Sequence, residues 1–94
     1  MLALTEHAAV AIRGLVAAAE LPDGGLRIDS PDANGAAPHY EARIAPAPDP
    51  GDEILDAGGA HVFLPRSAAD RLDDKVLDVR VYSDHVLFTV GTLD

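Results

Sequence analysis

The spacing between apolar residues changes near residue 25 of this 94-residue chain. Up to that point apolar side chains recur every three or four residues, which places them on one face of a helix. Thr5 suits the N-cap of that helix, and Glu6 puts a negative charge in its first turn. We therefore predict a helix over about 6–20, after a short strand at 2–4 and before a turn at 22–25. The predicted apolar face consists of Ala8, Ile12, Leu15, Val16 and Ala19.

Beyond residue 25 apolar and charged residues alternate, which is typical of half-buried strands. The pattern runs from Leu26 to Asp29 and again from Tyr40 to Ile44, so two strands are predicted there. The 29–39 segment between them is rich in proline, glycine, asparagine and aspartate, which favour turns. We therefore expect a loop that is long for a simple hairpin.

Glycine and proline residues divide the next part of the chain. Three prolines and one glycine lie within 45–52, which indicates a surface connector and excludes a central strand. Gly58 and Gly59 separate two short apolar runs, at 53–57 and 60–64, and suit the turn of a tight hairpin of type I′ or II′. A hairpin is therefore predicted over these residues.

The last third of the sequence predicts a short helix and another hairpin. Ser67 resembles an N-cap with Asp70 three residues later, which predicts a helix of one or two turns that ends near Leu72. Apolar residues then alternate with polar ones on both sides of a turn at 82–85. Two final strands are expected to flank that turn.

The order of these elements predicts the fold class. A helix, several strands, a short helix and a last hairpin follow one another without helical crossovers that would join parallel strands. We therefore expect an α+β fold with a mainly antiparallel sheet, one N-terminal helix and one short helix. The length is near the usual size of one domain, so a single domain over 1–94 is predicted.

The charge of the chain excludes some partners. Its formal net charge is −9, and its basic residues are one lysine, Lys75, and six scattered arginines. Phosphate backbones and anionic membranes reward clustered basic side chains, so we expect neither nucleic acid nor a membrane as partner. The first residues lack a basic region before an apolar run, and no stretch approaches the roughly 18 apolar residues of a membrane span. A cytoplasmic protein is therefore expected.

Several blocks of residues, in order along the chain, match one known pattern. They are Leu4, Thr5, Ala8, Ile12 and Leu15, then Gly25 to Ile28, Gly51 to Ile54, Gly59 to Val62, Ser67, Leu72, Asp73, Leu77 and Asp78. Together they resemble the HesB-like domains of the A-type iron–sulfur cluster carriers, which include the IscA-like proteins. The resemblance covers nearly the whole chain and implies a sandwich-like α+β fold that forms dimers or higher assemblies.

The resemblance also implies a chemistry that this sequence lacks the residues for. The carriers use three cysteines, one at the start of the strand that here contains Tyr40 and two in a Cys-Gly-Cys motif near the C-terminus. Gly35 aligns with the first of these, and the sequence ends at Gly91 to Asp94 where the motif would follow. The 94 residues contain no cysteine, so we expect no disulfide, no thiolate site and no bound iron–sulfur cluster.

Histidines and carboxylates offer a different metal site. The four histidines are dispersed, without the i, i+4 spacing that places two on one helical face, so no shared histidine site is expected. His39 ends the 29–39 loop, which also contains Asp29 and Asp32, and these groups could bind iron or another hard cation weakly. The alternative, which we favour, is that Asp32, Asn34 and Gly35 only form turns.

Enzymatic motifs are missing from the sequence. It contains no nucleophile elbow, no glycine-rich phosphate loop and no H-E-x-x-H motif. We therefore predict a non-enzymatic accessory or interaction protein, related to the carriers, that contacts a protein partner. A weak iron or divalent-metal protein that uses Asp29, Asp32 and His39 is the second hypothesis. The third is that the resemblance is architectural alone, because one fold hosts many functions.

Overall fold

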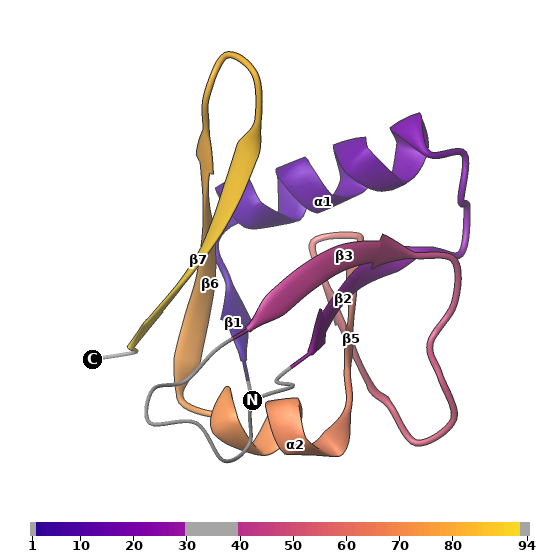
Figure 1. Ribbon diagram of the computed structural model, residues 1–94, viewed down its shortest axis with the longest axis vertical. Coiled ribbons are helices and arrows are strands. Elements are labelled where there is room, and N and C mark those ends of the chain that lie inside the picture. Colours follow the sequence, from indigo (N-terminus) through magenta and orange to yellow (C-terminus); the bar gives the residue numbers. More distant parts are fainter. Residues whose placement is uncertain (1, 30–39, 93–94) are drawn as a thin grey trace.

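The computed structural model describes residues 2–29 and 40–92, and its elements are drawn in Figure 1. Within these residues the chain forms two helices and seven strands. Neither helix is long and apolar enough to span a lipid bilayer. In chain order the elements are β1 (Ala3–Leu4), α1 (Glu6–Ala18), β2 (Gly25–Asp29), β3 (Glu41–Ala45), β4 (Glu53–Ala57), β5 (Ala60–Leu64), α2 (Arg66–Arg71), β6 (Lys75–Val81) and β7 (Val86–Thr92).

The strands form two sheets, which confirms the predicted α+β class. One sheet has the strand order β1-β6-β7 and the other β3-β2-β5-β4. Most pairs are antiparallel, but β1 pairs with β6, and β2 with β5, in parallel. The predicted mainly antiparallel arrangement is therefore confirmed, and no helical crossover joins β2 to β5. The chain instead reaches β5 from β2 through β3, the connector and β4, and both parallel pairs have only two residues in register.

The core lies between α1, the four-stranded sheet and β6, and α2 packs against β5 at its lower end (Figure 1). α1 buries Ala8, Ala9 and Ile12 there, whereas Leu15 and Val16 are half-buried and Ala19 is exposed. The predicted apolar face of the helix is therefore confirmed for its first half and too long at its C-terminal end. The largest fully buried side chains are Phe63, Ile12, Leu26, Ile28, Leu72, Leu77 and Val62.

Both predicted hairpins form, and one predicted helix cap does not. Gly58 and Gly59 both have positive φ, 59° and 80°, which is the backbone of a type I′ turn. α2 begins after Pro65, whose extended backbone makes it the N-cap residue, and no side chain caps the helix. The predicted cap at Ser67 is wrong because the fixed φ of Pro65 already ends the strand and starts the helix two residues earlier.

The hydroxyl of Thr5 joins α1 to β6. It accepts a hydrogen bond from the Ala8 backbone N–H (3.1 Å), which confirms the predicted N-cap, and it donates one to a carboxylate oxygen of Asp78 (2.7 Å). The same oxygen of Asp78 accepts from the Val79 backbone N–H at 2.8 Å. Hydrogen bonds from Thr5 and then Val79 lower the pKa of Asp78 below its ordinary value.

This lowered pKa predicts an acid-sensitive link between α1 and β6. Asp78 stabilises the fold while it is ionised, so its contribution is present at neutral pH and is lost as pH falls through its folded pKa. We expect the free energy of unfolding to fall less between pH 5 and pH 2 in Asp78→Asn than in the wild type. Asp70→Asn, at an exposed position on α2, is the control that should keep the wild-type slope. Equal slopes in all three proteins, measured by urea unfolding, would contradict the link.

Glu20 holds the left-handed backbone conformation that ends α1. Its φ is 57°, its N–H donates to the Ala17 carbonyl, and the Leu21 N–H donates to the Val16 carbonyl. These two bonds form a Schellman motif, in which glycine is the usual residue because it has no Cβ to clash. Glutamate at this place is strained, and its negative charge lies at the unfavourable end of the helix dipole.

Replacing this residue should therefore stabilise the protein. We expect Glu20→Gly to raise the free energy of unfolding by about 1 kcal/mol, because glycine adopts the left-handed conformation without strain. Ala17→Gly, three residues earlier inside the helix, should lower it by about 1 kcal/mol. Thermal unfolding of both variants checks the opposite signs, and a destabilised Glu20→Gly would show that the side chain makes a favourable contact.

Candidate functional site

The connector between β3 and β4 crosses one face of the four-stranded sheet. β3 and β4 are the two edges of that sheet, and residues 46–52, which link them, contact Arg27 of the central strand β2 through Asp49 and Asp52. The surface connector predicted from the prolines is thereby confirmed. The face beneath it lies opposite the helices and carries Arg27 and Phe63, which are register partners on β2 and β5. Phe63 is only 2% exposed although it lies outside the main core cluster.

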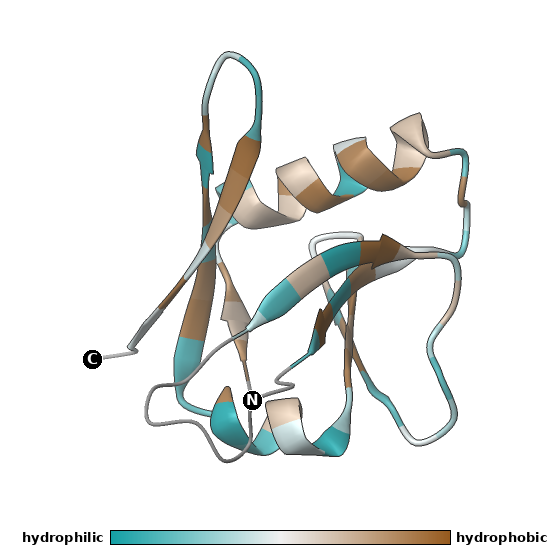
Figure 2. Ribbon diagram, viewed as in Figure 1, coloured by the Kyte–Doolittle hydropathy of each residue, from teal (hydrophilic) through white to brown (hydrophobic). Residues whose placement is uncertain are grey.

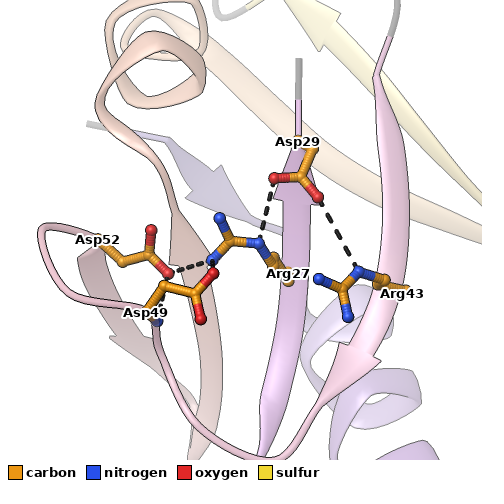
Figure 3. A network of polar contacts seen from close by, with 5 residues as sticks. All are labelled: Arg27, Asp29, Arg43, Asp49 and Asp52. Atoms are coloured by element: carbon orange, nitrogen blue, oxygen red, sulfur yellow. Dashed lines mark hydrogen bonds and ion pairs between the residues drawn. The ribbon is translucent and has the colours of Figure 1, made fainter. Parts of the chain in front are cut away.

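Arg27 is the centre of a charged network under this connector (Figure 3). Its guanidinium donates to a carboxylate oxygen of Asp52 and lies 3.3 Å from one of Asp49, while its Nε donates to Asp29 at 3.1 Å. The side chains of Arg27 and Asp52 are 10% and 3% exposed. Burial alone would lower the pKa of Arg27, but the hydrogen bond with Asp52 and the neighbouring carboxylates raise it above its ordinary value.

The network fixes the path of the connector. The carboxylate of Asp52 also accepts a hydrogen bond from the Asp49 backbone N–H (2.8 Å), which closes the turn before β4. The sequence pattern predicted a half-buried strand at 26–29, and Arg27 instead becomes buried because the connector covers that face. No local pattern in the sequence indicates the contact of Arg27 with Asp49 and Asp52, because both aspartates lie more than 20 residues from it.

Removing one partner of this buried pair should destabilise the fold. We expect Asp52→Asn to lower the free energy of unfolding by about 3 kcal/mol, because it leaves the buried guanidinium without its closest counter-charge. Asp49 is 65% exposed, so Asp49→Asn should cost less than about 1 kcal/mol. Urea unfolding of the two variants measures the difference. Equal effects would show that Asp52 contributes no more than a surface charge.

Asp29 is the member of the predicted cation site that the structure describes. It lies at the end of β2, and its two carboxylate oxygens are 3.1 Å from Nε of Arg27 and 4.0 Å from Nε of Arg43 (Figure 3). Two guanidinium groups therefore compete with any cation for this carboxylate. Asp32 and His39 lie outside the described residues, so the proposed site stays a prediction. Within 2–29 and 40–92 no three histidine, cysteine or acidic side chains are grouped to hold a metal ion.

The other histidines lie apart from one another. His61 is on β5, a central strand, and its Nε2 is 3.6 Å from a carboxylate oxygen of Asp56. Its alternation with Val62 predicts a side chain on the opposite, solvent-facing side of the strand, and the side chain is partly exposed there. His85 is in the turn of the last hairpin, where its ring stacks on Tyr82 with centroids 4.6 Å apart.

A groove of about 450 Å³ lies between Tyr40 and the C-terminal half of β7. Both segments adjoin places where the resemblance puts the carriers' cysteines. Tyr40 comes after Gly35, which lies outside the described residues, and β7 comes before the position of the Cys-Gly-Cys motif. The groove offers a phenol, an ammonium group and a threonine hydroxyl among apolar side chains. The ammonium group is that of Lys75, which is already paired with Asp74 at 2.7 Å. Its lining residues are Tyr40, Lys75, Phe88, Val90, Gly91 and Thr92.

This lining does not fit an iron–sulfur cluster. Iron in such clusters is held by thiolates, with imidazole as a partial replacement at some positions. None of the six lining residues supplies either group. Tyr40, Phe88 and Val90 are instead partly buried and packed against the core, so the groove has an apolar floor with polar groups at its rim.

Comparisons with known proteins agree with this fold. No family model matches the sequence. The uncharacterized protein blr1755 of Bradyrhizobium diazoefficiens is 32% identical over 80 residues, which cover 83% of this chain and 74% of that protein. Escherichia coli SufA, a protein involved in the biosynthesis of iron–sulfur clusters, is 27% identical with a TM-score of 0.80, over 97% of this chain and 79% of SufA.

Two further solved structures support the fold alone. IscA, crystallised with its [2Fe-2S] cluster, has 21% identity and a TM-score of 0.68, over 98% of this chain and 82% of its own. A protein from Aquifex aeolicus, solved in solution, has 18% identity and a TM-score of 0.76, over 95% of this chain and 88% of its own. All three superpositions span nearly the whole chain, so the likeness is one of complete fold and not of a single motif.

Proposed function

Because the chain belongs to the HesB-like family of A-type iron–sulfur cluster carriers, as a member without cysteine, we propose that it is a non-enzymatic accessory protein of iron–sulfur assembly. It acts by contacting a protein partner and ligates no cluster itself. The observation that carries the proposal is a carrier fold, superposable on SufA over 97% of the chain, in a sequence with no thiolate ligand.

Ligand chemistry supports the loss of carrier activity. A cluster needs several soft anionic sulfur ligands, which the 94 residues lack, and the polar side chains of the groove between Tyr40 and β7 are hard or neutral donors. A phenol, an ammonium group and a hydroxyl do not replace the thiolate ligands that stabilise iron in its sulfide-bridged forms. The scaffold around the groove is nevertheless intact, which favours a role that uses its shape.

The composition of the groove supports a protein partner. Its apolar floor and polar rim resemble the arrangement of protein interfaces, which have an apolar centre surrounded by polar groups. Lys75 is the single lysine of a chain with net charge −9, and it lies at this rim. A partner segment with apolar and acidic side chains would match the groove better than a basic one.

The first test asks whether the purified protein holds a cluster. We expect no acid-labile sulfide and no visible charge-transfer absorption after anaerobic incubation with ferrous iron and sulfide, because no thiolate is present to bind iron. E. coli SufA treated in parallel is the positive control. Near-stoichiometric iron with sulfide would refute the proposal. Iron without sulfide, lost in His39→Ala, would support the weak cation site of Asp29, Asp32 and His39 instead.

The accessory role is tested in the same preparation by mixing the protein with cluster-loaded SufA. We expect an equimolar amount to change the rate at which SufA loses its cluster, followed by visible absorption. Lys75→Glu, at the groove, should abolish this effect. Arg80→Glu, which makes the same charge change further along β6, is the matched control and should retain it. An unchanged rate with the wild-type protein counts against this role.

A further inference from the structure

A cavity of about 490 Å³ lies between the C-terminal half of α1, the turn at 20–24 and the start of β5. It shares no lining residue with the groove between Tyr40 and β7, so it is a separate feature of the molecule. Small-molecule sites commonly have volumes of about 300–1,000 Å³, with an apolar lining and a few polar groups. The volume of the cavity therefore fits a small ligand, and its lining indicates which kind.

The floor of this cavity is apolar because the apolar face of α1 continues beyond the core. Ile12 and Ala60 are fully buried, whereas Val16 and Leu21 are half-buried, and all four residues line the cavity. Figure 2 shows the hydrophobic colouring continuing into the C-terminal half of α1. Apolar side chains that the protein covers only in part are available to the apolar part of a ligand.

Local backbone structure fixes the shape of the cavity. The Schellman motif at the end of α1 turns the chain so that Leu21 comes back toward Val16, the pair that commonly makes a hydrophobic contact in this motif. The Gly24 N–H then donates to the Leu21 carbonyl at 2.9 Å. A Cβ on Gly24 would lie 2.9 Å from the Ala45 carbonyl oxygen, so the turn packs tightly against the end of β3. The cavity is therefore formed by the fold itself, before any ligand binds.

Arg13 gives one end of the cavity a positive charge. Its Nη1 donates to the Gly58 carbonyl at 2.5 Å, so the guanidinium lies beside the β4–β5 turn. A guanidinium has five N–H donors, and this bond uses one of them. No carboxylate within residues 2–29 and 40–92 forms an ion pair with Arg13. The guanidinium therefore has both charge and donors left for a ligand.

The other ionisable groups of the lining leave this end of the cavity to an anion. Glu20 follows Arg13 by seven residues, about 10 Å along a helix axis, which exceeds the Debye length of about 8 Å at physiological salt. His61 also lines the cavity, but its side chain faces away from the core and lies 3.6 Å from the carboxylate of Asp56. An anion needs a local cation in a chain with net charge −9, and Arg13 supplies it.

We propose that this cavity binds a medium-chain fatty acid, with the carboxylate at Arg13 and the apolar chain along α1 toward Leu21. The guanidinium donates charge-assisted hydrogen bonds to the carboxylate, which are stronger than neutral ones. The chain covers Val16 and Leu21, which the protein leaves half-buried. The inference goes beyond the proposed function and does not rest on it, because the cavity lies apart from the groove and needs no cysteine.

Calorimetric titration with octanoate tests the role of Arg13. We expect saturable binding of one octanoate to the wild-type protein, and binding weaker by roughly tenfold in Arg13→Gln, because the carboxylate loses its charge-assisted hydrogen bonds. Arg66→Gln, which removes an equal charge at an exposed position on α2, is the matched control and should keep the wild-type affinity. Octanol should bind less tightly than octanoate. Absence of binding, equal affinities for the two ligands, or equal effects of the two variants would overturn the proposal.

A second pair of variants tests the location of the apolar chain. Ala17 lines the cavity and is exposed, so Ala17→Phe should fill the space without disturbing the core and should abolish octanoate binding. Ala18→Phe adds the same side chain at the next exposed helix position, outside the lining, and should leave binding unchanged. Methyl NMR of the wild-type protein should show octanoate-induced shifts at Val16 and Leu21. Binding that persists in Ala17→Phe, or shifts confined to the exposed Val81 of β6, would overturn the proposed site.

Discussion

The buried ion pair between Arg27 and Asp52 fixes how the two halves of the four-stranded sheet are joined. The connector must cross two central strands to reach β4, and its prolines deny it a place in the sheet. Asp52 anchors the end of this crossing on β2, and Asp49 closes the turn before it. With that path fixed, β4 and β5 form a hairpin beside β2, and the apolar sides of β2 and β5 meet the two helices. The positions of β4 and β5 beside β2 therefore depend on Arg27, a charged residue within a buried strand.

Local signals in the sequence predicted local structure well. The N-cap at Thr5, the type I′ turn at Gly58 and Gly59, and the alternation in the last hairpin each depend on neighbouring residues, and each is confirmed. Features that depend on distant residues have no such local signal in the sequence. Arg27 alternates like a solvent-facing residue, and its burial depends on a connector 20 residues later. The two parallel pairs are likewise set by distant residues, because β1 and β6, and β2 and β5, are separated along the chain by several other elements.

The candidate sites likewise divide into those with a local signal in the sequence and those formed by distant residues. The predicted cation site rested on the composition of one loop, and the described part of it, Asp29, is engaged by two arginines from β2 and β3. The groove between Tyr40 and β7 joins segments about 50 residues apart, and it was reached through the resemblance rather than through spacing or composition. A chain can therefore share the fold of the carriers while the side chains that line this groove supply no thiolate.

The contact between Thr5 and Asp78 joins residues 73 positions apart, and β1 pairs with β6 beside it. Contacts of such high sequence separation slow folding, because the entropy of closing a long loop is lost before any interaction repays it. During synthesis the first strand must wait until β6 has left the ribosome. Until then the apolar side chains that β6 covers, among them those of β1, remain available to chaperones, although α1 can already pack against β2 and β5.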